Sequence, residues 1–187
     1  MISEIIPTNQ FHYLINNKKF DEALKFAEKN NLSKQVVLKA KLSNLLEDIN
    51  SSTINYNVQE IIEDLNQMMD IDYVLSFCID LKLTNYEDTL AILTYADQRI
   101  KNSNQQQKDN NLVLKIQQYI KRLGTYVIMK KEGSINSGIP FNSKEWQLFK
   151  DSDIIEDIKK CFYYGKILLG IVIWRRHLMG MYLKRIY

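Results

Sequence analysis

The sequence predicts an all-α protein, an irregular α-solenoid built from stacked helix hairpins like those of ARM and TPR repeats. Apolar residues recur every three or four positions along most of the chain, which is the spacing of one helix face. Two prolines and six glycines in 187 residues leave few breaks for a fold rich in strands. Each apolar face must be covered by a neighbour, so successive short helices are expected to stack.

The first three helices are predicted at residues 8–17, 20–30 and 34–49. The clearest pattern lies in Phe20–Asn31, FDEALKFAEKNN, where two asparagines follow an amphipathic segment and end it. The apolar face of this segment consists of Phe20, Ala23, Leu24 and Ala27, with Phe11, Leu14 and Ile15 at similar spacing before it and Leu38, Leu42, Leu45, Leu46 and Ile49 after it.

The next four helices are predicted at residues 57–69, 71–82, 85–101 and 111–130, separated by polar connectors near residues 50–57 and 102–111. Ser33 is expected to cap the third helix and Thr84 or Asn85 the sixth, because such side chains accept hydrogen bonds from free backbone N–H groups at a helix start. Gly124 lies inside the seventh helix. It predicts either the close approach of a neighbouring backbone or a kink.

The last three helices are predicted at residues 143–150, 153–163 and 166–184, with Ser143 and Ser152 as caps of the first two. A loop at residues 132–142, which contains two glycines and a proline, separates a helical-repeat array at 1–131 from carboxy-terminal helices at 143–187 that continue the array. We expect the two parts to form one structural unit.

The charges are distributed unevenly, although the net charge is only +3. Residues 158–187 contain seven basic side chains and no acidic one, whereas residues 1–157 contain 18 basic and 22 acidic ones. The basic excess indicates either a solvated helix face or attraction to an acidic protein, nucleic acid or anionic lipid. Since aromatic and basic residues do not alternate on a strand-like run, no direct nucleic-acid binding is expected.

No pattern indicates a catalytic, metal or cofactor site. His12 and His177 are the only histidines, and neither has a second His or Cys three or four residues away. The acids of residues 151–157 lack the glycine and glutamate spacing of a calcium loop and suit the start of a helix. The nucleophile-elbow and phosphate-loop patterns are also missing. We therefore expect no enzymatic activity, no cofactor and no small-molecule substrate.

The chain is expected to be intracellular and to have no membrane span. Its first residues, Met1–Glu4, lack a basic region followed by an apolar block. The longest apolar block, Ile167–Trp174, has eight residues, against about 20 needed to cross a bilayer. Cys78 and Cys161 are far apart on apolar faces, which favours buried thiols in a reducing compartment over a disulfide or metal ligands.

Two tryptophans and four basic residues are candidate interaction residues. A large amphipathic ring contributes strongly to binding when it fills a partner's pocket, but the same ring can pack in the core of its own chain. The basic residues follow or flank the second tryptophan in the acid-free terminal segment. The candidates are Trp146, Trp174, Arg175, Arg176, Lys184 and Arg185.

The order of several short motifs resembles the Rough deal (Rod) family, the large subunit of the kinetochore-associated Rod–Zwilch complex, and most closely its first armadillo-like helical segment. The resemblance covers about residues 11–178. It is carried by Phe20–Ala23 with Phe26 and Ala27, Val37 with Lys39–Leu42, Tyr73–Cys78, Tyr86–Thr89 leading to Leu93, Tyr95, Ala96 and Arg99, then Trp146 with Phe149, and finally Ile173–His177.

The resemblance implies a helical scaffold at the kinetochore in mitosis, and in the cytoplasm or nucleus otherwise. It implies a role in the spindle assembly checkpoint and in dynein recruitment, with a Zwilch-like subunit and a dynein adaptor as protein partners. The alternative is a helical subunit of a vesicle coat or membrane tether. The family's β-propeller and long helical continuation lie outside this sequence, which is expected to be a fragment or a shortened copy. No counterpart in the family is expected for residues 178–187.

Overall fold

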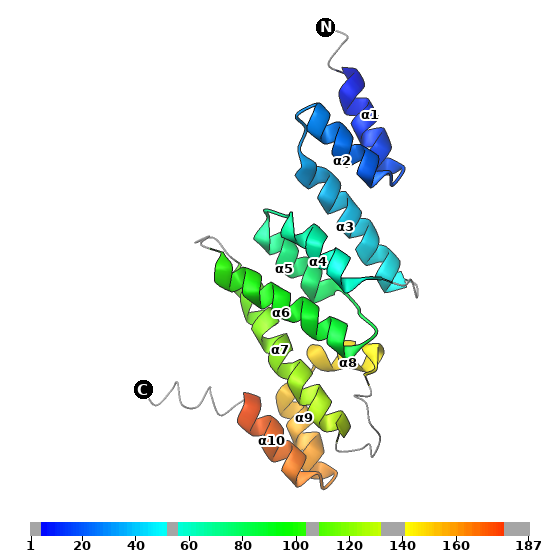
Figure 1. The fold of residues 1–187 in the computed structure, drawn as a ribbon. Coiled ribbons are helices and arrows are strands. Elements are labelled where there is room, and N and C mark those ends of the chain that lie inside the picture. The colour runs from blue at the N-terminus through cyan, green and yellow to red at the C-terminus, as the bar shows by residue number, and fades with distance from the viewer. Residues whose placement is uncertain (1–4, 52–55, 104–108, 132–140, 178–187) are drawn as a thin grey trace. The chain divides into compact units, whose positions relative to one another are not determined.

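The computed structural model describes residues 5–51, 56–103, 109–131 and 141–177. Within these residues the chain forms ten α-helices and no strand (Figure 1). The all-α prediction is therefore confirmed. The helices group into two compact units, Met1–Leu81 and Lys82–Tyr187. The predicted division around the loop at 132–142 stays a prediction, because most of that loop lies outside the described residues.

The first unit contains five helices whose bounds agree with the predicted ones to within a few residues. Consecutive helices contact one another from α1 to α4. The helices are α1 (Ile5–Asn16), α2 (Phe20–Lys29), α3 (Lys34–Ser51), α4 (Val58–Asn66) and α5 (Ile71–Asp80).

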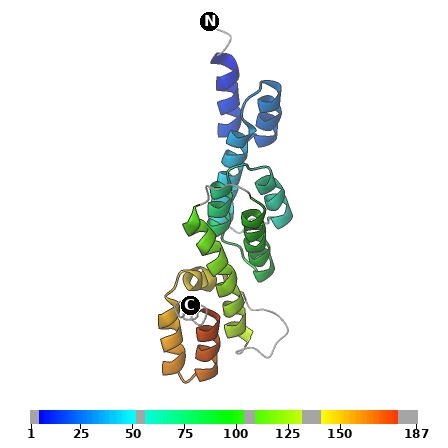
Figure 2. The ribbon, with the colours of Figure 1, turned by 90° about the vertical axis from the view of Figure 1, so that its left-hand side faces the viewer.

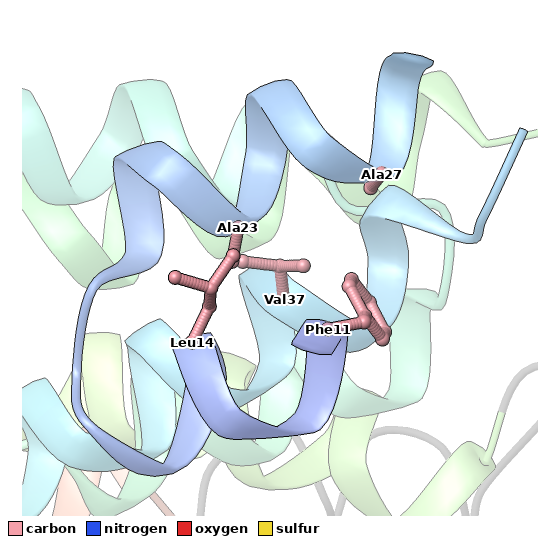
Figure 3. Packing of buried hydrophobic residues seen from close by; sticks show 5 residues of the cluster. All are labelled: Phe11, Leu14, Ala23, Ala27 and Val37. Atoms are coloured by element: carbon pink, nitrogen blue, oxygen red, sulfur yellow. The ribbon is translucent and has the colours of Figure 1, made fainter. Parts of the chain in front are cut away.

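A small apolar core joins the first three helices. Phe11 and Leu14 of α1 point toward Ala23 and Ala27 of α2 and Val37 of α3 (Figure 3). The two alanines are fully buried, and their short side chains let the neighbouring helices approach closely. Larger residues close the edges of this core, namely Ile15, Phe20, Leu24, Phe26 and Leu32. The faces of α1 and α2 are those that the sequence pattern identified, whereas Val37 was not in the predicted face of the third helix.

The same backbone motif ends α1, α2 and one later helix. After α1, Lys18 has a φ of 58° and the Lys19 N–H donates to the Leu14 carbonyl at 2.9 Å. After α2, Asn31 has a φ of 53° and the Leu32 N–H donates to the Ala27 carbonyl at 2.8 Å. A left-handed residue followed by a bond to the carbonyl five residues back is the Schellman motif, which satisfies carbonyls that the helix end leaves free. It also reverses the chain, so the next helix packs on the previous one.

Polar contacts connect α3 to the residues that join α4 and α5. The Gln35 amide donates to the Gln67 carbonyl and accepts from the Met69 N–H, both at 2.9 Å. The Lys39 ammonium lies 2.7 Å from the Asp70 carboxylate, which also caps α5 by accepting from the Tyr73 N–H. The ion pair lowers the pKa of Asp70, because the carboxylate accepts a hydrogen bond from the ammonium and a second from the backbone. These bonds fix the connection against α3.

The second unit contains the other five helices. The long α7 contacts α6, α8 and α10, and α9 contacts α10. The helices are α6 (Tyr86–Asn102), α7 (Asn110–Lys131), α8 (Ser143–Lys150), α9 (Ile154–Tyr163) and α10 (Ile167–His177).

Helix caps in the second unit agree only in part with the sequence. Asn85, one of the two expected caps, accepts from the Asp88 N–H at 2.7 Å. The predictions for Ser143 and Ser152 are wrong. Asn142 caps α8 by accepting from the Lys144 and Glu145 N–H groups, and Asp153 caps α9. Asn and Asp cap at least as well as Ser, and each adjoins the serine that was chosen.

A Lys18→Gly substitution is expected to raise the free energy of unfolding by up to about 1 kcal/mol. Glycine occupies the left-handed region without the Cβ clash that a lysine suffers there, and that gain exceeds the added entropy of the unfolded chain. Urea unfolding followed by circular dichroism measures the change.

Lys25 supplies the matched control, since it is an exposed lysine in the middle of α2. A Lys25→Gly substitution should lower the free energy of unfolding by about 1 kcal/mol, as glycine does inside helices. If Lys18→Gly destabilises the protein as much as Lys25→Gly does, the turn does not contribute in the way described.

Candidate protein interaction surface

The α9–α10 hairpin carries most of the candidate interaction residues that the structure describes. Its two helices lie side by side near the carboxy-terminal end of α7 (Figures 1 and 2). Asp153 starts α9 by accepting from the Ile155 N–H at 2.8 Å. Gly165 ends it with a φ of 73°, and the Lys166 N–H donates to the Cys161 carbonyl at 2.8 Å. This is the Schellman turn already seen after α1 and α2, here with the glycine that the geometry prefers.

The inner face of the hairpin is apolar and covered. Ile158 and Cys161 of α9 form a cluster with Leu169 and Ile173 of α10. Ile128 and Met129 of α7, together with Ile154, pack against that cluster. The hairpin is therefore held on α7 by one face of each helix.

Two side chains near the end of α10 lie against the middle of α7. The His177 ring nitrogen Nε2 lies 2.8 Å from the Thr125 hydroxyl, which is buried. A Cβ added at Gly124 would lie 2.6 Å from the guanidinium of Arg176. The close approach predicted for Gly124 is thus made by a side chain, where the sequence suggested a neighbouring backbone or a kink.

The surroundings of His177 disfavour its charged form. Partial burial is the largest cause that lowers the pKa of His177 to about 4, and the positive charges of Arg122, Arg176 and Lys121 contribute to the same shift. His177 is therefore neutral at physiological pH and available for the hydrogen bond with Thr125.

The outer face of the hairpin is also apolar, but it is exposed. On α10, Ile167, Ile171 and Trp174 are exposed and follow the helix period, and Trp174 retains 40% of its accessible surface. On α9 the ring of Phe162 lies against Gly170, where an added Cβ would be 3.1 Å from it. We call this surface the hairpin stripe, and it consists of Ile155, Phe162, Ile167, Ile171 and Trp174.

Positive charges flank the hairpin stripe. Arg175 follows Ile171 by one helical turn, Lys159 precedes Phe162 by about one turn, and Lys166 lies in the exposed turn between the helices. Lys159 pairs with Glu156 at 2.6 Å, and both groups are more than half exposed. Within the described part of α10 there is no acidic residue. An apolar surface with a positive rim is typical of a protein contact surface.

Trp146, by contrast, is buried. It retains 2% of its accessible surface on α8. Edge-to-face contacts place its ring centroid 6.0 Å from that of Tyr126 and 6.4 Å from that of Tyr119, both on α7. Phe141 and Phe149 complete the cluster. Trp146 therefore holds α8 on α7 and offers no free ring to a partner in this arrangement.

Arg122 is a buried residue that the sequence reading missed. Its guanidinium donates to the Phe149 carbonyl at 2.8 Å and to the Ser152 hydroxyl at 3.2 Å. Burial lowers the pKa of Arg122, while the nearby carboxylates of Asp157 and Asp151 act in the opposite direction. The Ser152 hydroxyl in turn donates to Asp157 at 2.5 Å, and Tyr119 donates to Asp151. The acids at residues 151–157 thus serve this network and the start of α9.

The six candidate residues have different fates. Trp174 and Arg175 lie on the exposed side of α10, whereas Arg176 is exposed but lies against Gly124 of α7. Trp146 lies in the aromatic cluster with α7. Lys184 and Arg185 lie outside the described residues. A helical wheel of α10 would have shown Ile167, Ile171 and Trp174 on one apolar face, so the sequence contained a signal for this part of the hairpin stripe.

Metal ligation, thiol pairing and membrane insertion can each be compared with the part of the chain that the structure describes. No three His, Cys, Asp or Glu side chains lie close enough there to hold a metal ion. Cys78 and Cys161 are both buried, as predicted, and burial raises the pKa of Cys78 to about 12. None of the described helices is long and apolar enough to cross a membrane.

A family model described as the KNTC1 first ARM-repeats domain matches residues 13–183. The chain belongs to this ARM-repeat family. The match confirms the resemblance drawn from the sequence, and it identifies the described helices as part of an ARM-repeat solenoid. It extends to residue 183, so the expectation that the family has no counterpart to residues 178–187 is wrong for residues 178–183.

Two curated relatives match this ARM-repeat domain at low identity. Both are named kinetochore-associated protein 1, from mouse and from human. The mouse protein is 23% identical over 185 residues and the human protein 23% identical over 186 residues. Each alignment covers 94% of this chain and 8% of the relative, so the chain spans a small part of either protein. No solved structure matches the chain significantly.

A Trp146→Ala substitution is expected to lower the free energy of unfolding by about 3 to 5 kcal/mol, because it empties the centre of the aromatic cluster between α7 and α8. Leu148→Ala is the matched control on the same helix, since Leu148 retains 77% of its accessible surface. It should change stability by less than about 0.5 kcal/mol. Urea unfolding of both variants measures the difference, and equal small losses would contradict the assigned packing.

His177 predicts a specific dependence of stability on pH. Its pKa in the folded state, about 4, is below the ordinary value of 6.5. Between these values the unfolded chain binds a proton that the folded chain does not, so stability falls as the pH drops from about 6.5 to 4. After allowance for solvent at this half-buried site, the loss should be about 1 to 2 kcal/mol.

A His177→Gln substitution tests this because glutamine keeps a polar contact with Thr125 and does not titrate. The stability of the parent chain relative to the variant should decrease between pH 6.5 and pH 4, a comparison that cancels the carboxylates common to both. Parallel stability curves would show that His177 is not held neutral on α7.

Proposed function

We propose that the chain is a non-catalytic helical scaffold of a kinetochore complex that supports the spindle assembly checkpoint and dynein recruitment in mitosis. The observation that carries the proposal is the match of residues 13–183 to an ARM-repeat domain, together with two relatives named as kinetochore-associated. Neither relative is named as a coat or tether subunit, so a role on vesicles is not proposed.

The architecture suits a scaffold in physical terms. A helix hairpin buries one face of each helix against its neighbour and leaves the other face available for a partner. In the second unit, aromatic contacts and the Arg122 network hold α7, α8 and the start of α9 together. A surface carried on such a support changes shape little on binding, which limits the entropy lost.

The proposed partners are proteins, namely a Zwilch-like subunit and a dynein adaptor. Trp174, Arg175 and Arg176 are the proposed contact residues among those described, because they are exposed on α10. Trp146 supports them from inside the unit, and Lys184 and Arg185 remain candidates on sequence grounds. The proposed location is the kinetochore in mitosis, and the cytoplasm or nucleus at other stages.

The location of the protein in dividing cells tests this function. A fluorescent fusion expressed from its own gene should coincide with a centromere marker in prometaphase, whereas the fluorescent tag alone should be diffuse. Cells that lack the gene should leave mitosis early when their microtubules are depolymerised.

A fusion on Golgi or endoplasmic reticulum membranes, absent from kinetochores, would contradict the proposal. A fusion at kinetochores in cells whose mitotic arrest is normal without the gene would keep the scaffold role and remove the checkpoint role.

A further inference from the structure

We infer that the hairpin stripe binds an acidic amphipathic helix of a partner protein. The inference rests on the proposed scaffold role for the existence of a protein partner, and it adds the chemistry of that partner. It follows from the shape of the stripe, its apolar character and the charges around it.

The shape of the stripe fits a helix. Ile167, Ile171 and Trp174 follow one another at spacings of four and three residues, so they form a line about two helical turns long, or roughly 10 Å. The Phe162 ring lies beside this line, against Gly170. A surface of this width matches the apolar face of one helix, whose anchors recur at i, i+3 or i+4, and i+7.

The burial pattern shows why the stripe needs a cover. Ile173 and Leu169 of α10 are buried by α7 and α9, and they satisfy the need of the hairpin for a core. The residues of the stripe take no part in that core, yet every one of them is apolar. A partner that covers these side chains removes apolar surface from water, and this favours the complex.

The basic residues beside the hairpin stripe indicate the charge of the partner. Lys159, Lys166 and Arg175 border the stripe. The acidic residues in the described part of the hairpin are Asp153, Glu156 and Asp157, all in the cap or first turn of α9. Asp157 accepts a hydrogen bond from Ser152, away from the stripe. A helix with glutamates beside its apolar face would therefore be attracted, and a basic helix repelled.

The same charges disfavour two other occupants. A second copy of the chain would place the same basic rim against itself, because a two-fold interface brings identical patches together. Residues 178–187 contain Lys184 and Arg185 and no acid, so their composition does not match the rim either. An anionic membrane would be attracted by the charges, but a line one helix wide fits a helix better than a broad lipid surface.

Two designed peptides test the inference with the full chain. The first is a fluorescein-labelled helix of about 18 residues, long enough for five turns, with leucines on one face and glutamates beside them. The second has lysines in place of the glutamates. Fluorescence anisotropy should show micromolar binding of the acidic peptide, weakened by salt, and at least about tenfold weaker binding of the basic one.

Substitutions locate the binding. Ile171→Glu should weaken the acidic peptide at least about tenfold, because it places a carboxylate in the centre of the stripe. Arg175→Glu should weaken the acidic peptide and strengthen the basic one. Leu148→Glu is the matched control, because Leu148 is an exposed apolar residue on α8, and it should bind as the parent does. Circular dichroism checks that each variant is folded.

Several outcomes would overturn the inference. The peptides could bind equally, or Ile171→Glu could leave binding unchanged. Phosphatidylcholine vesicles that contain phosphatidylserine could bind in place of the peptide and lose binding in Ile171→Glu, which would assign the stripe to a membrane. Sedimentation could show a dimer that Ile171→Glu dissociates, which would assign the stripe to a second copy.

The proposed function and this inference can fail separately. Peptide binding by a protein that is absent from kinetochores would refute the proposed location and keep this inference.

Discussion

Every described part of the fold depends on one constraint: a single helix of 8 to 22 residues cannot shield its own apolar face from water. Short helices of this kind are stable only when a neighbour covers the stripe that their sequence carries. Tight turns provide that neighbour at once, because the Schellman turns after α1, α2 and α9 each send the chain back along the helix it has just left. Among the first three helices, Ala23 and Ala27 are fully buried, and their short side chains allow close packing.

Apolar burial is not directional, so polar contacts determine how the helices are oriented. Gln35 binds the connection between α4 and α5 through both ends of its amide, which only one placement of that connection allows. Arg122 does the same in the second unit, where its guanidinium joins the end of α8 to the start of α9. The hydrogen bonds and the nearby carboxylates offset the free energy that a buried cation loses with its water. Such contacts specify an arrangement that leucine and isoleucine would leave open.

The sequence was sufficient to predict the helices, because the apolar period reports on local geometry and survives without knowledge of the neighbours. It was not sufficient for the caps at Asn142 and Asp153. A serine adjoins each of them and is also a good cap, so the choice depends on which residue begins the helix. Nor could it predict the fates of the two tryptophans. Trp146 and Trp174 both lie in amphipathic helices, but α7 presents Tyr119 and Tyr126 to the first, while the second faces away from α7. Arg122 was missed because a basic residue in a helix is usually solvated, and only tertiary contacts identify the exception.

The two faces of α10 show how one helix can serve both folding and recognition. The face with Leu169 and Ile173 resembles every other buried face in the unit, and its loss would release the hairpin from α7. The opposite face has the same apolar character without a neighbour, and an apolar face in water is unfavourable unless binding later covers it. His177 lies where α10 meets α7, and its hydrogen bond with Thr125 helps to hold the hairpin in position on α7. The inner face therefore fixes the orientation of α10 before a partner binds the outer face. Because less conformational entropy is lost on binding to a fixed surface, a stripe of five side chains can act as a recognition surface.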